Sequence, residues 1–266
     1  MYPSILHSQN KHLTIAQISD LHLIGKVGTH DSYQRFLGVL QLAITQNPDL
    51  LVLTGDLVND GNSTAYDWLF ATLQRTKIPF VCLAGNHDVT HEIGIDLPFN
   101  ERIHLPITPD ERLPMTHRIF LARQNWQLLL VNTATMGRDD GRIAQTDLAW
   151  LEQMLATHTV PTIIALHHQP LAIGSRWIDD LMLQNADEFW QIISRHTHAQ
   201  AVICGHVHQA HQLDAPTDHQ CTLFTCPAVA RQFLPFADDF ALDELPAGFR
   251  LLQIEQNQLK SNIKRL

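Results

Sequence analysis

The sequence is poor in cysteine and has neither a long apolar run nor a leader-like N-terminus. It has four cysteines among 266 residues, none in a CxxC pair, and a chain of this size does not depend on disulfides for stability. We therefore expect reduced thiols. No apolar run approaches the roughly 20 residues of a membrane-spanning helix, and the N-terminus lacks the basic start and apolar stretch of a signal peptide. These absences predict a soluble, cytoplasmic protein with no membrane partner.

Basic residues are also scarce. The chain has 18 Lys and Arg against 27 Asp and Glu, which gives a formal net charge of −9 with histidine neutral. Such a balance does not favour binding to nucleic-acid phosphates or to anionic membranes. Nucleic acid is therefore not an expected partner, and the oligomeric state stays open.

What the sequence does contain is enough apolar material for one substantial core. Apolar residues make up 45% of the chain, and there is no internal repeat, low-complexity tract or Pro/Gly/Ser-rich linker. We predict a single domain over residues 1–266. The chain also has 17 histidines, nearly as many as Lys and Arg together, which directs attention to metal-ligand spacing.

Strand-length apolar runs alternate with helical patterns along the first 205 residues. The runs lie at 13–19, 49–54, 78–84, 126–133, 161–166 and 199–204, and several are continuously apolar, as in strands buried on both faces. Helical spacing of apolar residues follows Ser32, Ser63, Thr146 and Asn185. After residue 205, we predict short antiparallel strands at 220–225, 248–255 and 258–264. The order indicates a layered α/β sandwich.

The segment 91–116 breaks this pattern. It is rich in proline and charge and has weak periodicity, which predicts a long loop or broken helix over the site. Such a loop is expected to contribute to substrate specificity.

Five polar clusters directly follow five of the predicted strands. Because ligands bind at the carboxyl ends of strands in open α/β sheets, we expect the clusters to converge on one crevice. They are Asp20-Leu21-His22, Gly55-Asp56 with Asp60-Gly61, Gly85-Asn86-His87-Asp88, His167-His168 and Gly205-His206-Val207-His208.

The residue types in these clusters suit metal binding. In an extended segment, residues i and i+2 point the same way, so Asp20 and His22 can face one ion, as can His206 and His208. Carboxylate, imidazole and amide groups together suit Mn, Fe or Zn better than Ca or Cu(I). Asp56 is a candidate bridge between two ions. Glycines beside Asp56, Asn86 and His206 allow the backbone to approach closely.

Together, these motifs resemble the complete motif set of the calcineurin-like metallophosphoesterases over residues 20–208. The resemblance implies a four-layer α/β/β/α sandwich with a dinuclear metal site at strand carboxyl ends. Further features are similar to the bacterial class III 3',5'-cyclic AMP phosphodiesterases. These are His167-His168-x-Pro170-Leu171, the segment from Gly174-Ser175-x-Trp177 to Asn185-Ala186, Cys226-Pro227 and Pro246-x-Gly248-x-Arg250.

The resemblance also implies a ligand set for two divalent or mixed-valence ions of Fe, Mn or Zn. One ion would be held by Asp20, His22, Asp56 and His208. The other would be held by Asp56, Asn86, His167 and His206, with Asp56 shared. The chain has Ala84 where many members of this family have proline, which removes no ligand.

The implied reaction is hydrolysis of cyclic AMP to 5'-AMP by a metal-bridging hydroxide. Because the leaving 3' oxygen is a poor alkoxide, a proton donor is valuable, and His87 is the candidate, with Asp88 fixing its tautomer or raising its pKa. The alternative is that His87 only orders its loop. The residues expected to contact the nucleotide substrate are His22, Asp56, Asn86, His87 and His208.

Four further residues are candidates for the nucleotide side of the pocket: His168, Arg176, Trp177 and Asn185. Arg176 can pair with phosphate and Trp177 can stack on a base, but an exposed salt bridge and an ordinary packed tryptophan explain them equally well. Cys204 is expected to be a buried core thiol.

Two other functions remain open. The same metals serve protein phosphatases, nucleotide or sugar-nucleotide pyrophosphatases and general phosphodiesterases, and the motifs do not choose among these substrates. The second alternative is a metal-free scaffold that acts only by binding a protein, against which the intact ligand set argues.

Overall fold

The computed structural model describes residues 2–8, 12–59, 61–94, 97, 101–114, 116–255 and 258–266. The helices are α1 (Asp31–Ile44), α2 (Ser63–Arg75), α3 (Gln145–Thr157), α4 (Arg176–Asp179) and α5 (Ala186–Ser194), with a 3-10 turn, η1, at Asn86–Asp88. The strands are β1 (Ile5–Leu6), β2 (Leu13–Ile18), β3 (Leu50–Thr54), β4 (Phe80–Leu83), β5 (Thr90–Ile93), β6 (Ile103–Pro106), β7 (Thr116–Leu121), β8 (Trp126–Val131), β9 (Thr162–Ala165), β10 (Ala199–Cys204), β11 (Gln212–Asp214), β12 (Thr222–Thr225), β13 (Gly248–Glu255) and β14 (Gln258–Arg265). The six strands and four helices predicted for the first 205 residues are all present.

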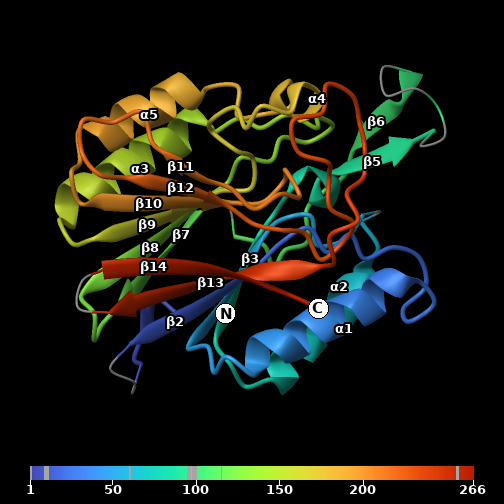
Figure 1. Ribbon diagram of the computed structural model, residues 1–266, viewed down its shortest axis with the longest axis horizontal. Coiled ribbons are helices and arrows are strands. Elements are labelled where there is room, and N and C mark those ends of the chain that lie inside the picture. Colours follow the sequence, from blue (N-terminus) through green and yellow to red (C-terminus); the bar gives the residue numbers. More distant parts are fainter. Residues whose placement is uncertain are drawn as a thin grey trace.

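Two sheets form the centre of the molecule. One has seven strands in the order β1-β7-β8-β9-β10-β12-β11, and the other has five in the order β14-β13-β2-β3-β4. Helices α3 and α5 lie on the outer side of the seven-stranded sheet, and α1 and α2 lie on the outer side of the other (Figure 1). This is the predicted four-layer α/β/β/α sandwich.

The continuous apolar runs are explained by burial on both faces of each sheet. In β3, Leu50 and Val52 pack between the sheets, whereas Leu51 and Leu53 pack under α1 and α2. The central strands of the seven-stranded sheet alternate in the same way against α3 and α5. Because both faces of a strand meet apolar layers, period-two alternation of polarity disappears from the sequence.

The predictions after residue 205 were partly right. Strands β13 and β14 pair antiparallel, as expected. Strand β12 instead pairs parallel with β10 and antiparallel only with the short β11. The antiparallel prediction is therefore confirmed for the pairing of β12 with β11. The parallel pairing of β12 with β10 was not predicted, because a local sequence pattern does not say from which end the chain re-enters the sheet.

The buried Arg250 of the tail has a structural role. It is 3% exposed, and its guanidinium donates hydrogen bonds to the carbonyl oxygens of Thr225 and His211. It thereby ties β13 in one sheet to the β12 end of the other.

The described part of the chain contains no helix long and apolar enough to cross a membrane.

The segment 91–116 also differs from its prediction. Strands β5 and β6 pair antiparallel, with Thr90 opposite Pro106, and form a two-stranded sheet that projects beside the carboxyl ends of the central strands (Figure 1). Residues 95, 96, 98–100 and 115 lie outside the described residues. The expected loop or broken helix is therefore in part a β-hairpin, whose apolar residues such as Ile103 are exposed rather than packed in a core.

Candidate metal centre

All five polar clusters follow strands, as predicted. Those beginning at Asp20, Gly55 and Gly85 follow β2, β3 and β4 of the five-stranded sheet, and those beginning at His167 and Gly205 follow β9 and β10 of the other. The two sheets therefore contribute to one site where their strand ends meet. Asp60, quoted with the second cluster, lies outside the described residues.

The side chains of Asp20, His22 and His208 bring their ligand atoms close to one another on one side of the site. The Nε2 atoms of His22 and His208 are 3.1 Å apart, and His208 Nε2 is 3.6 Å from Asp20 Oδ1. His22 Nε2 is also 3.6 Å from Asp56 Oδ2. These four residues are those of the first predicted ligand set, which stays a prediction.

A second group surrounds the other oxygen of Asp56. His167 Nε2 lies 3.4 Å from Asp56 Oδ1 and 3.1 Å from Asn86 Oδ1. The ring of His206 is 5.2 Å from that of His167, and its buried Nε2 has no hydrogen-bond partner among the described residues. Asp56 thus presents one oxygen to each group, which is the geometry a bridging ligand requires.

Hydrogen bonds to the far side of three imidazoles fix which nitrogen faces the site. His167 Nδ1 lies 2.7 Å from the Thr54 carbonyl oxygen, and His208 Nδ1 lies 2.7 Å from that of Arg231. Carbonyl oxygens only accept, so each Nδ1 carries a proton and each Nε2 is the nitrogen that faces the cluster. His22 Nδ1 is held in the same way, 2.7 Å from Asn59 Oδ1.

Sequence reasoning missed these partners. Thr54 and Arg231 act through their backbone carbonyls, for which no side-chain pattern exists. Asn59 was the one detectable candidate, as a polar residue in the turn three positions after Asp56. These groups orient the ligands, and loss of such partners typically costs 10- to 100-fold in metal affinity.

The backbone around the ligands is not extended, contrary to the spacing argument. Five of the predicted ligand residues have positive φ angles between 45° and 68°: Asp20, His22, Asp56, His206 and His208. Their side chains converge because left-handed turns follow the strands, not because alternate residues share a face. Such conformations are costly for non-glycine residues and are concentrated at functional sites.

Two glycines let the backbone lie close enough to the acidic side chains for this cluster to form. A Cβ on Gly85 would overlap Asp56, and a Cβ on Gly205 would overlap the hydroxyl of Ser19 and approach Asp20. The predicted requirement for glycine beside the ligands is therefore confirmed.

Burial and neighbouring charges shift the pKa values of the carboxylates and imidazoles in the site. Burial alone would raise the pKa of Asp56, but the imidazoles of His167 and His87 hold it well below its ordinary value. Burial alone would lower the pKa of His167, but the Asp56 carboxylate raises it to about 9. Burial also raises the pKa of Asp20 to about 7 and lowers that of His22 to about 4. A buried set of carboxylates, imidazoles and one amide, with an unpartnered imidazole nitrogen, fits two divalent cations.

His87 lies beside the cluster without belonging to either predicted ligand set. Its backbone N–H donates to Asp56 Oδ1 at 3.0 Å, and its ring centroid is 4.8 Å from that of His22. The side chain is only partly buried, so part of it is exposed to solvent beside the ring of His22.

Asp88 has different neighbours from those expected. Its carboxylate accepts hydrogen bonds from the backbone N–H groups of Leu57, Val58 and Gly85 and from the Tyr66 hydroxyl. Burial raises its pKa to about 6. These contacts tie the Asp56 loop to η1. The structure thus assigns Asp88 a positioning role and shows no contact by which it would fix the tautomer of His87.

Two of the four candidates for the nucleotide side are held inside the protein. His168 is fully buried, with Nδ1 2.8 Å from the Thr133 hydroxyl and Nε2 3.1 Å from the Asp139 carbonyl oxygen. Asn185 makes two hydrogen bonds with the backbone of Ile143. These bonds occupy the polar atoms of both side chains, but the His168 ring lies 4.5 Å from that of His206, so His168 adjoins the histidine cluster. A place for these two residues beside the nucleotide stays a prediction.

The other two candidates lie on α4. Arg176 is exposed, whereas the partly buried Trp177 packs against Phe233 and Phe240 at ring-centroid distances of 4.9 and 5.2 Å. Cys204 is fully buried in β10, as expected for a core thiol.

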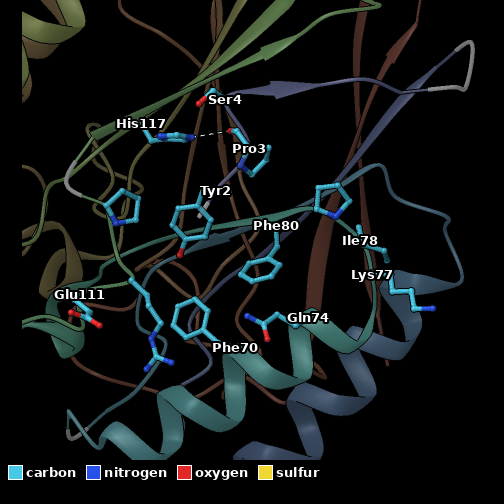
Figure 2. A pocket seen from close by; sticks show the side chains of 13 residues that line it. Tyr2, Pro3, Ser4, Phe70, Gln74, Lys77, Ile78, Phe80, Glu111 and His117 are labelled. Atoms are coloured by element: carbon cyan, nitrogen blue, oxygen red, sulfur yellow. Dashed lines mark hydrogen bonds between the residues drawn. The ribbon is translucent and has the colours of Figure 1, made fainter.

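A cavity of about 840 Å³ lies apart from the metal centre, between the N-terminus, α2 and the segment before β7 (Figure 2). Tyr2, Phe70 and Phe80 form its aromatic wall, and His117 donates a hydrogen bond to the Pro3 carbonyl oxygen at its upper edge. It shares no lining residue with the predicted ligand set. The ligand chemistry described above, not cavity size, therefore identifies the functional site.

Residues 13–210 match the family model of the calcineurin-like phosphoesterases, and the chain belongs to this family. It is thus an enzyme of the metallophosphoesterase class, with aspartates and histidines positioned for a metal site.

Two similar proteins carry related names. The chain is 52% identical over 256 residues to a "Probable cyclic nucleotide phosphodiesterase" of Moraxella catarrhalis, covering 96% of this chain and 92% of that protein. It is 32% identical over 261 residues to the "3',5'-cyclic adenosine monophosphate phosphodiesterase CpdA" of Escherichia coli K12, covering 95% and 89%.

Solved structures share the fold. A dimetal phosphatase from Danio rerio superposes with a TM-score of 0.59 at 14% identity, covering 95% of this chain and 98% of that one. The purple acid phosphatase PPD1 from yellow lupin seeds gives 0.67 at 12% identity, covering 99% and 52%. At these identities, the likeness shows the metallophosphoesterase fold alone.

Proposed function

We propose that the protein hydrolyses the 3',5'-cyclic phosphodiester of cyclic AMP to 5'-AMP, using two bound ions of Fe, Mn or Zn. The observation that carries the proposal is the position of Asp56, whose two carboxylate oxygens face two separate groups of buried ligand atoms. The names of the similar proteins support the choice of a cyclic nucleotide as substrate.

The proposed ligands form two sets, one for each ion. Asp20, His22, Asp56 and His208 would hold one ion, and Asp56, Asn86, His167 and His206 the other. Two such ions supply Lewis acidity for the phosphate oxygens and a nucleophilic water at neutral pH. His22, Asp56, Asn86, His87 and His208 form the surface on which the phosphate would bind.

His87 is the residue proposed to move a proton. It is anchored through its backbone to Asp56, and its imidazole borders the site. A protonated imidazole there can donate to the leaving 3' oxygen of the ribose, which is a poor leaving group as an alkoxide. Asp88 and Tyr66 hold the turn that carries His87.

The test is hydrolysis of a panel of substrates by the purified protein with added Mn²⁺, with the products separated. We expect 3',5'-cyclic AMP to give 5'-AMP at a rate well above those for 2',3'-cyclic AMP, a phosphomonoester and an aryl phosphodiester. A chelator should abolish the activity, and added Mn²⁺ should restore it. Turnover of the aryl diester alone would reject cyclic AMP and favour a general phosphodiesterase.

A further inference from the structure

An aromatic cluster adjoins the first group of metal ligands. The ring of Phe233 stacks on that of His208, with centroids 3.9 Å apart and planes within 5° of parallel. Phe240 lies 5.5 Å from Phe233 at 70°, and 5.2 Å from Trp177 at 80°. The cluster therefore runs from a predicted metal ligand to the surface of the protein.

The outermost ring is incompletely covered. Phe240 is 61% exposed, although its neighbours Phe233 and Trp177 are each partly buried. The rings of Phe233 and Trp177 contact the Phe240 ring in T-shaped geometry. They support that ring on one side, while part of its surface is open to solvent. A large apolar ring held open in this way is available for stacking.

The segment that carries Phe240 is held in place beside His208. The backbone N–H of Leu234 donates to the Ala241 carbonyl oxygen at 2.8 Å, and that of Asp243 donates to Gln232 at 3.0 Å. At the start of the same segment, the Arg231 carbonyl oxygen accepts the Nδ1 proton of His208. The segment thus orients a metal ligand and presents the exposed ring.

The negative charges near the Phe240 ring favour the base of a nucleotide over its phosphate. Asp238 and Asp239, both exposed, directly precede Phe240. Two carboxylates disfavour a phosphate but are good acceptors for an exocyclic amino group of a base. The phosphate is therefore expected at the metal centre and the base towards Phe240.

We propose that Phe240, supported by Phe233 and Trp177, is the platform on which the base of the nucleotide stacks. The inference rests on the proposed function, since it requires a nucleotide substrate. It replaces the expectation that Trp177 itself stacks on the base: Trp177 acts as a support for Phe240.

The test is binding of 5'-AMP and of ribose 5-phosphate to the Mn²⁺-loaded protein, measured by isothermal titration calorimetry. Because the variant removes the aromatic surface on which the base would stack, Phe240→Ala should weaken AMP binding about tenfold. Binding of ribose 5-phosphate should change by less than about twofold, since it has no base. Phe240→Trp should retain AMP affinity.

Phe236→Ala is the matched control. Phe236 lies in the same segment and is 74% exposed, but its ring lies 6.4 Å from that of His211, outside the cluster. AMP binding should be unchanged in this variant. An equal loss in both alanine variants, or no loss in Phe240→Ala, would overturn the proposal.

The binding measurement separates this inference from the proposed function. If the wild-type protein binds AMP more tightly than ribose 5-phosphate, and only Phe240→Ala removes the difference, the platform is supported even if cyclic AMP is not hydrolysed. Wild-type protein that hydrolyses cyclic AMP but binds both ligands equally would contradict the platform and leave the proposed reaction intact.

Discussion

Replacing Asp56 with alanine is expected to remove metal binding and activity together. The two carboxylate oxygens lie 3.4 Å from His167 Nε2 and 3.6 Å from His22 Nε2, so one substitution removes a ligand from both predicted ion sites. We expect kcat/KM for cyclic AMP to fall by about 10³-fold or more, because stabilisation of the transferring phosphoryl group depends on both ions. Metal content per chain, measured by mass spectrometry of the purified variant, should fall in parallel.

Two further variants separate this effect from misfolding. Asp56→Asn keeps the volume of the side chain and removes its charge, so it should also lose metal while folding normally by circular dichroism. Asp31→Ala removes a carboxylate that is 62% exposed and paired with Arg35 on α1, and it should retain metal and activity. An Asp56→Ala protein that keeps two ions per chain would show that the ligand assignment is wrong.

Replacing His87 with alanine is expected to slow the reaction without removing metal. The side chain belongs to neither predicted ligand set and borders the site, so metal content should stay at the wild-type value. Loss of a general acid typically costs 10²- to 10⁴-fold, so kcat for cyclic AMP should fall by that amount, with a smaller change in KM. An aryl phosphodiester with a good leaving group should lose less than about tenfold, since its leaving group needs little protonation.

The comparison of the two substrates decides the role of His87. Equal losses on cyclic AMP and on the aryl ester would exclude proton donation and indicate that His87 binds the phosphate. His12→Ala provides a control, because the His12 side chain is 50% exposed and lies 3.5 Å from Glu255 Oε1. That variant should match the wild-type protein on both substrates.

The central strands could be predicted from the sequence because each is covered by apolar layers on both faces. Leu50 to Leu53 meet apolar layers on both sides of β3, so a continuous apolar run suffices to predict a strand. The hairpin of β5 and β6 has no such layers, and its short strands mix exposed apolar residues with partly buried polar ones. No local pattern distinguished it from a loop.

The chemistry of the metal centre was predictable by residue type, but its geometry was not. Aspartate, asparagine and histidine at strand ends predicted a metal site, and the structure brings such groups together there. The division into two ligand sets came from the family resemblance and stays a prediction, whereas extended spacing gave the wrong backbone at Asp20 and His22. Tertiary contacts impose those left-handed conformations, and the Thr54 and Arg231 carbonyls that orient the imidazoles become neighbours only in the folded chain.

The most direct test of the two-ion centre is a crystal structure of the protein grown with Mn²⁺, with the ions located by anomalous scattering. We predict two peaks about 3.5 to 4 Å apart that share the Asp56 carboxylate. Asp20, His22 and His208 should complete one site, and Asn86, His167 and His206 the other. A single peak, or a second ion held by His168 instead of His206, would contradict the assignment.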